Sequence, residues 1–376
     1  MADAASATTV MNGLLKNENA MVKYLSLQQI TAMHADEIQA AVNKVVASGW
    51  YLQGEAVAAF EQEYATYTGA KHCISCGNGL DALTLMLQAY IETGKLKPGD
   101  EVIVPANTYI ATILAITNNH LKPILVEPRW DTLQIDDQLI EEAITPDTRA
   151  IMLVNLYGRQ AFTEHIGTIC KQHGLLLFED CAQSHGIAMH GDAQAHSFYP
   201  GKNLGALGDA GAVTTDDDQI AQIIRALGNY GSSRKYVFPY RGRNSRMDEI
   251  QAAVLRVKLQ YLNQDNARRQ EIADFYNTNI TSERIQIPAF RHANVYHIYP
   301  VMCKERELLQ QHLLSNGIET AIHYPIPPHQ QECYKEWNTL SFPITERIHQ
   351  QELSLPCNQA MTDAEVEAVV EAVNRF

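Results

Sequence analysis

Hydrophobic positions follow two different periods along this chain. Apolar residues recur at helical spacing over 27–46 and again over 55–67, and the segment Ser48-Gly49-Trp50 interrupts the pattern between them. Short apolar runs then alternate with amphipathic segments until about residue 178. We therefore expect two opening helices, followed by strands that alternate with further helices. The expected strands cover 72–75, 101–104, 123–126, 150–154 and 175–178, and the expected helices cover 80–90, 109–117 and 164–172.

This alternation predicts an α/β fold with a mostly parallel central sheet and helices on both of its faces. Most expected strands are apolar throughout and end in a polar or Gly-rich turn, where ligands bind in such sheets. Near Asp248 a long helical pattern begins, and short strands and Pro-rich turns follow it. We expect a large domain over 21–250 and a smaller C-terminal α+β domain over 251–376. Residues 1–20 are small and polar, and we expect them to be a flexible N-terminal extension or tag outside the fold.

Composition narrows the class of protein. The 376 residues are 46% hydrophobic and 19% charged, which is typical of a soluble globular protein. A net charge of -14 argues against a dedicated nucleic-acid binder, and no apolar run approaches the ~20 residues that a membrane helix needs. Seven scattered cysteines indicate a reducing, cytoplasmic setting. The pair Cys73 and Cys76 lacks further ligands nearby, so we expect no metal site.

Asp180 and Lys202 both follow the fifth expected strand in sequence, and both are candidate functional residues. Asp180 follows an apolar strand, where a carboxylate could bind a metal, act as a base, or pair with a protonated ring nitrogen. Lys202 lies in a turn rich in Pro and Gly, and a partly desolvated amine there would have the lowered pKa that a Schiff-base nucleophile requires. The alternative is a phosphate-binding lysine. A Walker A loop is excluded, because that motif needs glycine at His196 and Ser or Thr at Asn203.

Two further features suggest a bound phosphate and a planar ring. The sequence Gly77-Asn78-Gly79-Leu80 begins a helix after a strand, so its free backbone amides would face an anion. Tyr109 lies just past another strand end, where an aromatic ring is most often part of the core but could stack on a cofactor. Together with Asp180 and Lys202, these are the parts that a pyridoxal-phosphate enzyme needs.

From about Tyr24 to Arg375 the chain resembles the nucleotide-sugar aminotransferases of the DegT/DnrJ/EryC1/StrS group. The motifs that carry the resemblance are EDCAQSHG at 179–186, SFYPGKNLGALGDAG at 197–211 and NSRMDE at 244–249. The resemblance implies the fold type I architecture and pyridoxal 5'-phosphate as cofactor. The segment 187–195 is shorter than is usual in the group, which bears on the shape of the phosphate side.

The resemblance also implies roles for individual residues. Lys202 would form the internal aldimine and then shuttle the proton, and Asp180 would keep the pyridine nitrogen protonated. Asn244 would reach the phosphate from a neighbouring subunit, which implies a homodimer with shared active sites. The other cofactor contacts would be Gln183 at the ring hydroxyl, Tyr109 on the ring face, and Ser197 with the amides of Gly79 and Leu80 at the phosphate. His185, expected among the catalytic residues with Lys202 and Asp180, and His323 match histidines near the sugar, although each could equally be structural.

Two segments, 48–51 and 322–329, look like the branch that aminates carbon 3 of a dTDP-3-keto-6-deoxyhexose. The expected reaction moves an amino group from L-glutamate and gives a dTDP-3-amino-3,6-dideoxyhexose for polysaccharide, lipopolysaccharide or glycan synthesis. Arginines near Asn244 could pair with the diphosphate, or be plain surface charges. The expected substrate-binding residues are Trp50, Tyr51, Arg234, Arg243, His323 and Tyr324.

Other functions stay open at this point. The same chemistry could act at carbon 4 of a 4-keto sugar, and a non-catalytic regulatory protein could keep the fold. Related sugar dehydratases replace the aldimine lysine by histidine, so Lys202 argues against that reaction. A nicotinamide-dependent oxidoreductase would explain the glycine motif but would leave Lys202 without a role.

Overall fold

The computed structural model describes residues 21–289 and 293–376, and within them seven strands form one large sheet in the order β1-β7-β6-β5-β4-β2-β3. Strands β2 to β6 pair in parallel, whereas β7 runs antiparallel to both β1 and β6. The expected mostly parallel sheet is confirmed. Its strands are β1 His72–Cys76, β2 Glu101–Pro105, β3 Lys122–Val126, β4 Thr148–Val154, β5 Leu176–Asp180, β6 Ala193–Ser197 and β7 Gly211–Thr215.

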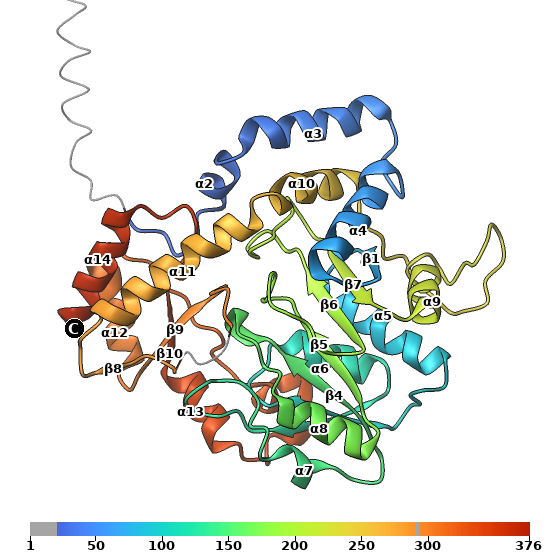
Figure 1. The fold of residues 1–376 in the computed structure, drawn as a ribbon. Helices are drawn as coiled ribbons and strands as arrows, with labels where there is room; N and C mark the ends of the chain where they lie inside the picture. Colours follow the sequence, from blue (N-terminus) through green and yellow to red (C-terminus); the bar gives the residue numbers. More distant parts are fainter. Residues whose placement is uncertain (1–20, 290–292) are drawn as a thin grey trace, which may run out of the picture.

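Helices cover both faces of this sheet, because successive strand residues point to opposite sides. Val102 and Met152 join a cluster on one face, while Ile103 and Ile151, their neighbours in sequence, join a cluster on the other. The first face is covered by α5 Gly79–Glu92, α6 Ile110–Asn118 and α9 Asp218–Gly228 (Figure 1). The second face is covered by α4 Glu55–Thr68, α7 Ile140–Ala143, α8 Glu164–His173 and α10 Glu249–Leu259.

The opening helical pattern contains a break that the sequence did not indicate. The expected helix over 27–46 is two helices, α2 Leu27–Ala32 and α3 Ala35–Ser48. His34 leaves helical geometry between them, and its ring stacks on Tyr261 with centroids 3.8 Å apart. Contact with a distant part of the chain therefore overrides the local helical period.

The C-terminal part builds a second core. Its sheet has the order β10-β9-β8 among the described residues, with β8 Ile285–Gln286, β9 Tyr299–Cys303 and β10 Glu352–Leu355. Figure 1 shows this sheet beside α11, α12 and α14, away from α9. The remaining elements are α11 Leu262–Asn279, α12 Arg306–Ser315, α13 Pro343–Gln351, α14 Asp363–Asn374, and the 3-10 turns η1 Leu156–Gly158, η2 Pro328–Gln330 and η3 Glu332–Trp337.

The start of the described chain belongs to this second core. Val22 is buried among the residues of α11, β9 and α14, and its backbone pairs with Gly317 and Glu319. The expected boundary between residues 250 and 251 falls inside α10, which packs against α3 and α4. We propose to place the boundary after α10 and to count the first few described residues with the small domain.

Two expectations concern the outer limits of the chain. The proposed N-terminal extension, residues 1–20, lies outside the described residues. Among the helices of 21–289 and 293–376, none has the combination of length and apolar character that crossing a bilayer demands.

Candidate active site

Asp180 is the last residue of β5 and lies at the carboxyl edge of the sheet. Its side chain is buried and accepts two hydrogen bonds, from Thr112 Oγ1 to Oδ2 at 2.8 Å and from the Ala182 amide to Oδ1 at 3.1 Å. Burial raises the pKa of Asp180, while these two donors and the charge of Lys202 act in the opposite direction. The carboxylate is therefore fixed in orientation and can face a cationic group.

Lys202 follows β6 in a rigid turn. The Lys202 amide donates to the Tyr199 carbonyl at 2.8 Å, and Lys258 Nζ donates to the Gly205 carbonyl at 2.7 Å from the second face. Burial lowers the pKa of the Lys202 amine to about 8, while the charge of Asp180 raises it. About a tenth of the amine is then neutral at neutral pH, which suits a nucleophile.

The N-terminus of α5 meets the end of β6 at a glycine. A Cβ on Gly79 would lie 2.5 Å from the Ser197 Cβ and 3.0 Å from its Oγ, so only glycine lets the two segments come this close. Asn78 caps the helix by accepting the Asp81 amide at 2.9 Å, which leaves the amides of Gly79 and Leu80 at the helix start. The Ser197 hydroxyl and these amides form a small anion site, called the phosphate site below.

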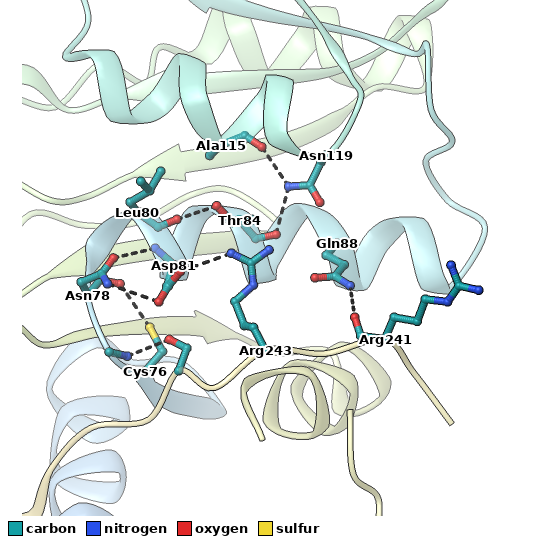
Figure 2. Close-up of polar contacts among 12 residues, drawn as sticks. Cys76, Asn78, Leu80, Asp81, Thr84, Gln88, Ala115, Asn119, Arg241 and Arg243 are labelled. Atoms are coloured by element: carbon teal, nitrogen blue, oxygen red, sulfur yellow. Dashed lines mark hydrogen bonds and ion pairs between the residues drawn. The ribbon is translucent and has the colours of Figure 1, made fainter. Parts of the chain in front are cut away.

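Arg243 borders this phosphate site. Its Nη1 lies 3.3 Å from Asp81 Oδ1, and Figure 2 shows its side chain directed at the first turn of α5. Two residues earlier, the Arg241 carbonyl accepts a hydrogen bond from Gln88 at 2.9 Å, so this segment runs along the helix (Figure 2). Arg243 is thus part of an ion pair within this chain.

Gln183 connects two aromatic residues at the site. Its Oε1 accepts from the Tyr157 amide at 2.5 Å, and its Nε2 donates to the Tyr324 hydroxyl at 3.0 Å. The Tyr324 ring in turn lies 4.9 Å from the ring of Tyr109, which is half exposed at the start of α6. A half-exposed ring beside a fixed amide is suited to cover a planar ligand.

The two histidines differ in their surroundings. His185 is 1% exposed, and neither of its ring nitrogens has a hydrogen-bond partner among the described residues. Burial lowers its pKa well below the usual range, with further contributions from His196 and Lys202. His323 is less enclosed, and its Nδ1 lies 2.8 Å from Ser354 Oγ. His323 is the better placed of the two to meet a ligand, while His185 resembles a neutral core residue beside Lys202.

Four of the expected site residues lie on the surface of this chain. Trp50 and Tyr51 are 64% and 51% exposed and precede α4, while Arg234 and Asn244 are exposed in the loop between α9 and α10. None of the contacts recorded within 21–289 and 293–376 joins them to Lys202. Their expected roles stay predictions, and that of Asn244 involves a neighbouring subunit.

The structure adds residues that the sequence analysis missed. Thr112 lies three positions after Tyr109 on α6, a spacing that places both on one side of the helix. Glu352 and Ser354 are polar residues at alternate positions of the buried strand β10, and such a pair in an apolar run was a readable signal. The shortened segment 187–195 leads into β6 and leaves Ser197 in contact range of Gly79.

The residues present fit pyridoxal phosphate. The buried amine of Lys202 could hold its aldehyde, the carboxylate of Asp180 its ring nitrogen, and the phosphate site its phosphate. Only glycine at position 79 allows the start of α5 to approach Ser197 this closely.

Comparison with known proteins agrees with this geometry. The family model described as the DegT/DnrJ/EryC1/StrS aminotransferase family matches residues 32–374. A dTDP-3-amino-3,6-dideoxy-alpha-D-galactopyranose transaminase of Aneurinibacillus thermoaerophilus is 51% identical over 95% of this chain and 99% of its own. Streptomyces venezuelae DesV, solved in complex with a ketimine intermediate, superposes with a TM-score of 0.91 at 39% identity over 95% of this chain and 98% of its own.

The structure of a second relative contains a bound cofactor. The NtdA protein of Bacillus subtilis, solved with bound cofactor PMP, superposes with a TM-score of 0.90 at 31% identity over 96% of this chain and 86% of its own. The fold of this chain thus agrees with the folds of these relatives. The chain belongs to the DegT/DnrJ/EryC1/StrS aminotransferase family and is a pyridoxal-phosphate-dependent aminotransferase.

Proposed function

We propose that this enzyme transfers an amino group from L-glutamate to carbon 3 of a dTDP-3-keto-6-deoxyhexose, giving a dTDP-3-amino-3,6-dideoxyhexose. The observation that carries the transaminase chemistry is the buried, partly neutral amine of Lys202 beside the carboxylate of Asp180. The name of the Aneurinibacillus relative supports amination at carbon 3 rather than carbon 4.

Pyridoxal phosphate, when bound, supplies the electron sink that stabilises a deprotonated carbon. The amine of Lys202 would hold the aldehyde carbon, and its lowered pKa allows both the neutral and the charged form near neutral pH, so it could take and return a proton. Asp180 would hold a proton on the ring nitrogen through a charge-assisted hydrogen bond, and Thr112 fixes the orientation of the carboxylate. Ser197 and the α5 amides would hold the phosphate.

The tyrosines and Gln183 would orient the ring. Tyr109 would cover one face, and Gln183 Nε2 could donate to a ring oxygen on the Tyr324 side. Tyr324 and His323 lie on the segment that leads from the small domain to this site, which supports a role for them in contacting the sugar.

We also propose that two copies associate, with Asn244 and Arg234 of one copy completing the site of the other. The loop that carries them exposes large side chains, including Tyr236 at 82% and Phe238, and a contiguous apolar surface of this kind favours burial against a partner. The exposed Trp50 and Tyr51 would meet the nucleotide sugar across the same interface. The free cysteines are consistent with a cytoplasmic enzyme of polysaccharide or lipopolysaccharide synthesis.

The test is a turnover assay with cofactor, L-glutamate and either a dTDP-3-keto or a dTDP-4-keto 6-deoxyhexose. We expect an amino sugar from the 3-keto isomer. Conversion of the 4-keto isomer alone would overturn the proposed position, and cofactor binding without any turnover would favour a regulatory protein.

A matched variant tests the amine itself. Lys202→Ala is expected to abolish turnover and to prevent borohydride from fixing the cofactor to the chain, while Lys258→Ala, on the far side of the same turn, keeps the labelling. Labelling that persists in the Lys202 variant would contradict the assignment.

A further inference from the structure

Two buried polar side chains lie behind His323 on strand β10. Glu352 and Ser354 are both 0% exposed and occupy alternate positions, so they point to the same face of the strand. Leu353 and Leu355, on the other face, belong to the core of the small domain. No ion pair is recorded for Glu352 within 21–289 and 293–376, and burying a carboxyl group without one is costly unless hydrogen bonds compensate.

These side chains form a set of contacts with His323, called the Glu352–Ser354–His323 chain below, and the side chain of Tyr24 adds a hydrogen bond with Ser354. Glu352 Oε2 accepts from the His323 backbone amide at 2.7 Å, and Glu352 Oε1 is in short contact with Ser354 Oγ. Ser354 Oγ lies 2.8 Å from His323 Nδ1. The Tyr157 hydroxyl donates to the His323 carbonyl at 2.7 Å and fixes the backbone of this segment.

The second ring nitrogen of His323, Nε2, is the atom that would contact a ligand. Among the described residues a hydrogen bond is recorded for Nδ1, and Nε2 lies across the ring from it. Burial and the charge of Lys202 lower the pKa of His323 to about 4, which places the ring within electrostatic reach of the reactive amine. A neutral imidazole carries one proton, on either Nδ1 or Nε2, and the partner of Nδ1 decides which.

The hydroxyl of Ser354 has one proton to give. If Glu352 is ionised, Ser354 donates to Oε1, so Nδ1 must carry a proton and donate to Ser354, and Nε2 is a bare acceptor. If Glu352 carries a proton, that proton lies on Oε1, because Oε2 accepts from the backbone amide. With the protonated hydroxyl of Tyr24 also donating to Ser354, both acceptor sites of Ser354 are taken. Ser354 then donates to Nδ1, and Nε2 becomes a donor.

We propose that Glu352 and Ser354 are positioning residues that set the ring tautomer of His323, and so decide whether Nε2 accepts or donates a hydrogen bond on the substrate side. The inference deepens the proposed function and rests on it for the identity of the substrate. A keto oxygen can only accept, so it requires the donor form of Nε2, whereas an amine or a hydroxyl can donate to the acceptor form.

Both states of Glu352 are accessible. Burial raises its pKa to about 8, and its hydrogen bonds and the more distant charge of Arg306 oppose this shift. Arg306 itself pairs with Glu307 and the His349 carbonyl. The other titratable or charged groups that face the chain come from the start of the described residues, η1, the 323–324 segment, the lysine turn, α11 and the segment before β9. They are Tyr24, Tyr157, Tyr324, Lys202, Arg269 and His297.

The decisive variant is Glu352→Gln. The amide oxygen of the glutamine must take the Oε2 position to accept from the His323 amide, so its NH2 group faces Ser354 and donates to it. Ser354 is then obliged to donate to Nδ1 at every pH. The variant keeps the size of the side chain and fixes the donor form of Nε2.

The measurement is 15N NMR of the histidine-labelled holoenzyme about one pH unit above the pKa of Glu352. We expect Nδ1 of His323 to show a protonated, pyrrole-type resonance in the wild type and a bare, pyridine-type resonance in Glu352→Gln, with His323→Asn used for assignment. The same tautomer in both proteins would overturn the proposal. Glu367→Gln, an exposed carboxylate on α14, is the matched control and is expected to leave the resonance unchanged.

Ser354→Ala gives a second route if Glu352→Gln fails to fold. Without the hydroxyl, the His323 tautomer is expected to stay the same as the pH passes through the pKa of Glu352. A tautomer that still changes in this pH range would overturn the proposed role of Ser354. In kinetics, KM for the keto sugar is expected to rise about tenfold in the wild type above this pH and to stay level in Glu352→Gln. The NMR readout needs no substrate, so it stands apart from failure of the proposed reaction.

Discussion

Gly79→Ala tests whether the phosphate site depends on the close approach of α5 to β6. The added Cβ would lie 2.5 Å from Ser197 Cβ, about 1 Å closer than ordinary carbon contacts allow. The helix start and the end of β6 must therefore move apart, and the phosphate cannot keep both the Ser197 hydroxyl and the helix amides. Losing one hydrogen bond to a charged group costs about 1.5–3 kcal/mol, so we expect the Kd for pyridoxal phosphate to rise about 10- to 100-fold.

The assay is a cofactor titration followed by absorbance, together with thermal unfolding of the cofactor-free protein. Alanine is preferred over glycine in helices by about 1 kcal/mol, so the variant is expected to keep its fold. Gly167→Ala on α8 is the matched control, because its Cβ meets only the edge of the Phe162 ring, away from the site. Unchanged cofactor affinity in Gly79→Ala, with the fold intact, would refute the assignment of the phosphate site.

Two other outcomes follow from Lys202 and Asp180. The neutral amine of Lys202 is the reactive form, so the rate of cofactor binding in stopped-flow measurements is expected to rise about tenfold per pH unit up to about pH 8 and then to level off. A rate that keeps rising towards the ordinary lysine pKa would contradict the effect of burial on Lys202. Thr112→Val removes the donor to Asp180 Oδ2 and so raises the pKa of Asp180. Because the ionised carboxylate is the active form, the acid limb of the kcat profile is expected to shift to higher pH. An acid limb at the wild-type position would show that Thr112 does not act on Asp180.

The order of elements was readable because apolar runs and amphipathic segments alternate strongly between β1 and β5. Strands β6 and β7 were missed, because AQAHS and GAVTT are polar or small and gain strand geometry only by pairing with each other and with β5 and β1. The break at His34 depends on Tyr261, more than 200 residues away, and no local pattern encodes such a contact.

The site residues show the same contrast between local sequence signals and long-range contacts. Asp180, Lys202 and Gly79 could be found because each follows a strand or begins a helix, and strand ends gather at one edge of a parallel sheet. Glu352 and Ser354 reach that edge only through the folding of the small domain against His323, which the sequence pattern does not reveal. Trp50, Tyr51, Arg234 and Asn244 came from resemblance, and their placement awaits a structure of two associated copies.

The backbone pairing of Val22 with Gly317 and Glu319 limits how the enzyme can open. The chain passes between the two cores at several places: before α2, at the junction of α10 and α11, and around 324–348, where Tyr324, Tyr334 and Ile348 pack with the large core. A swing about any one of these crossings alone would strain the others. We therefore expect closure over a substrate to proceed by small sliding of packed surfaces rather than by a hinge.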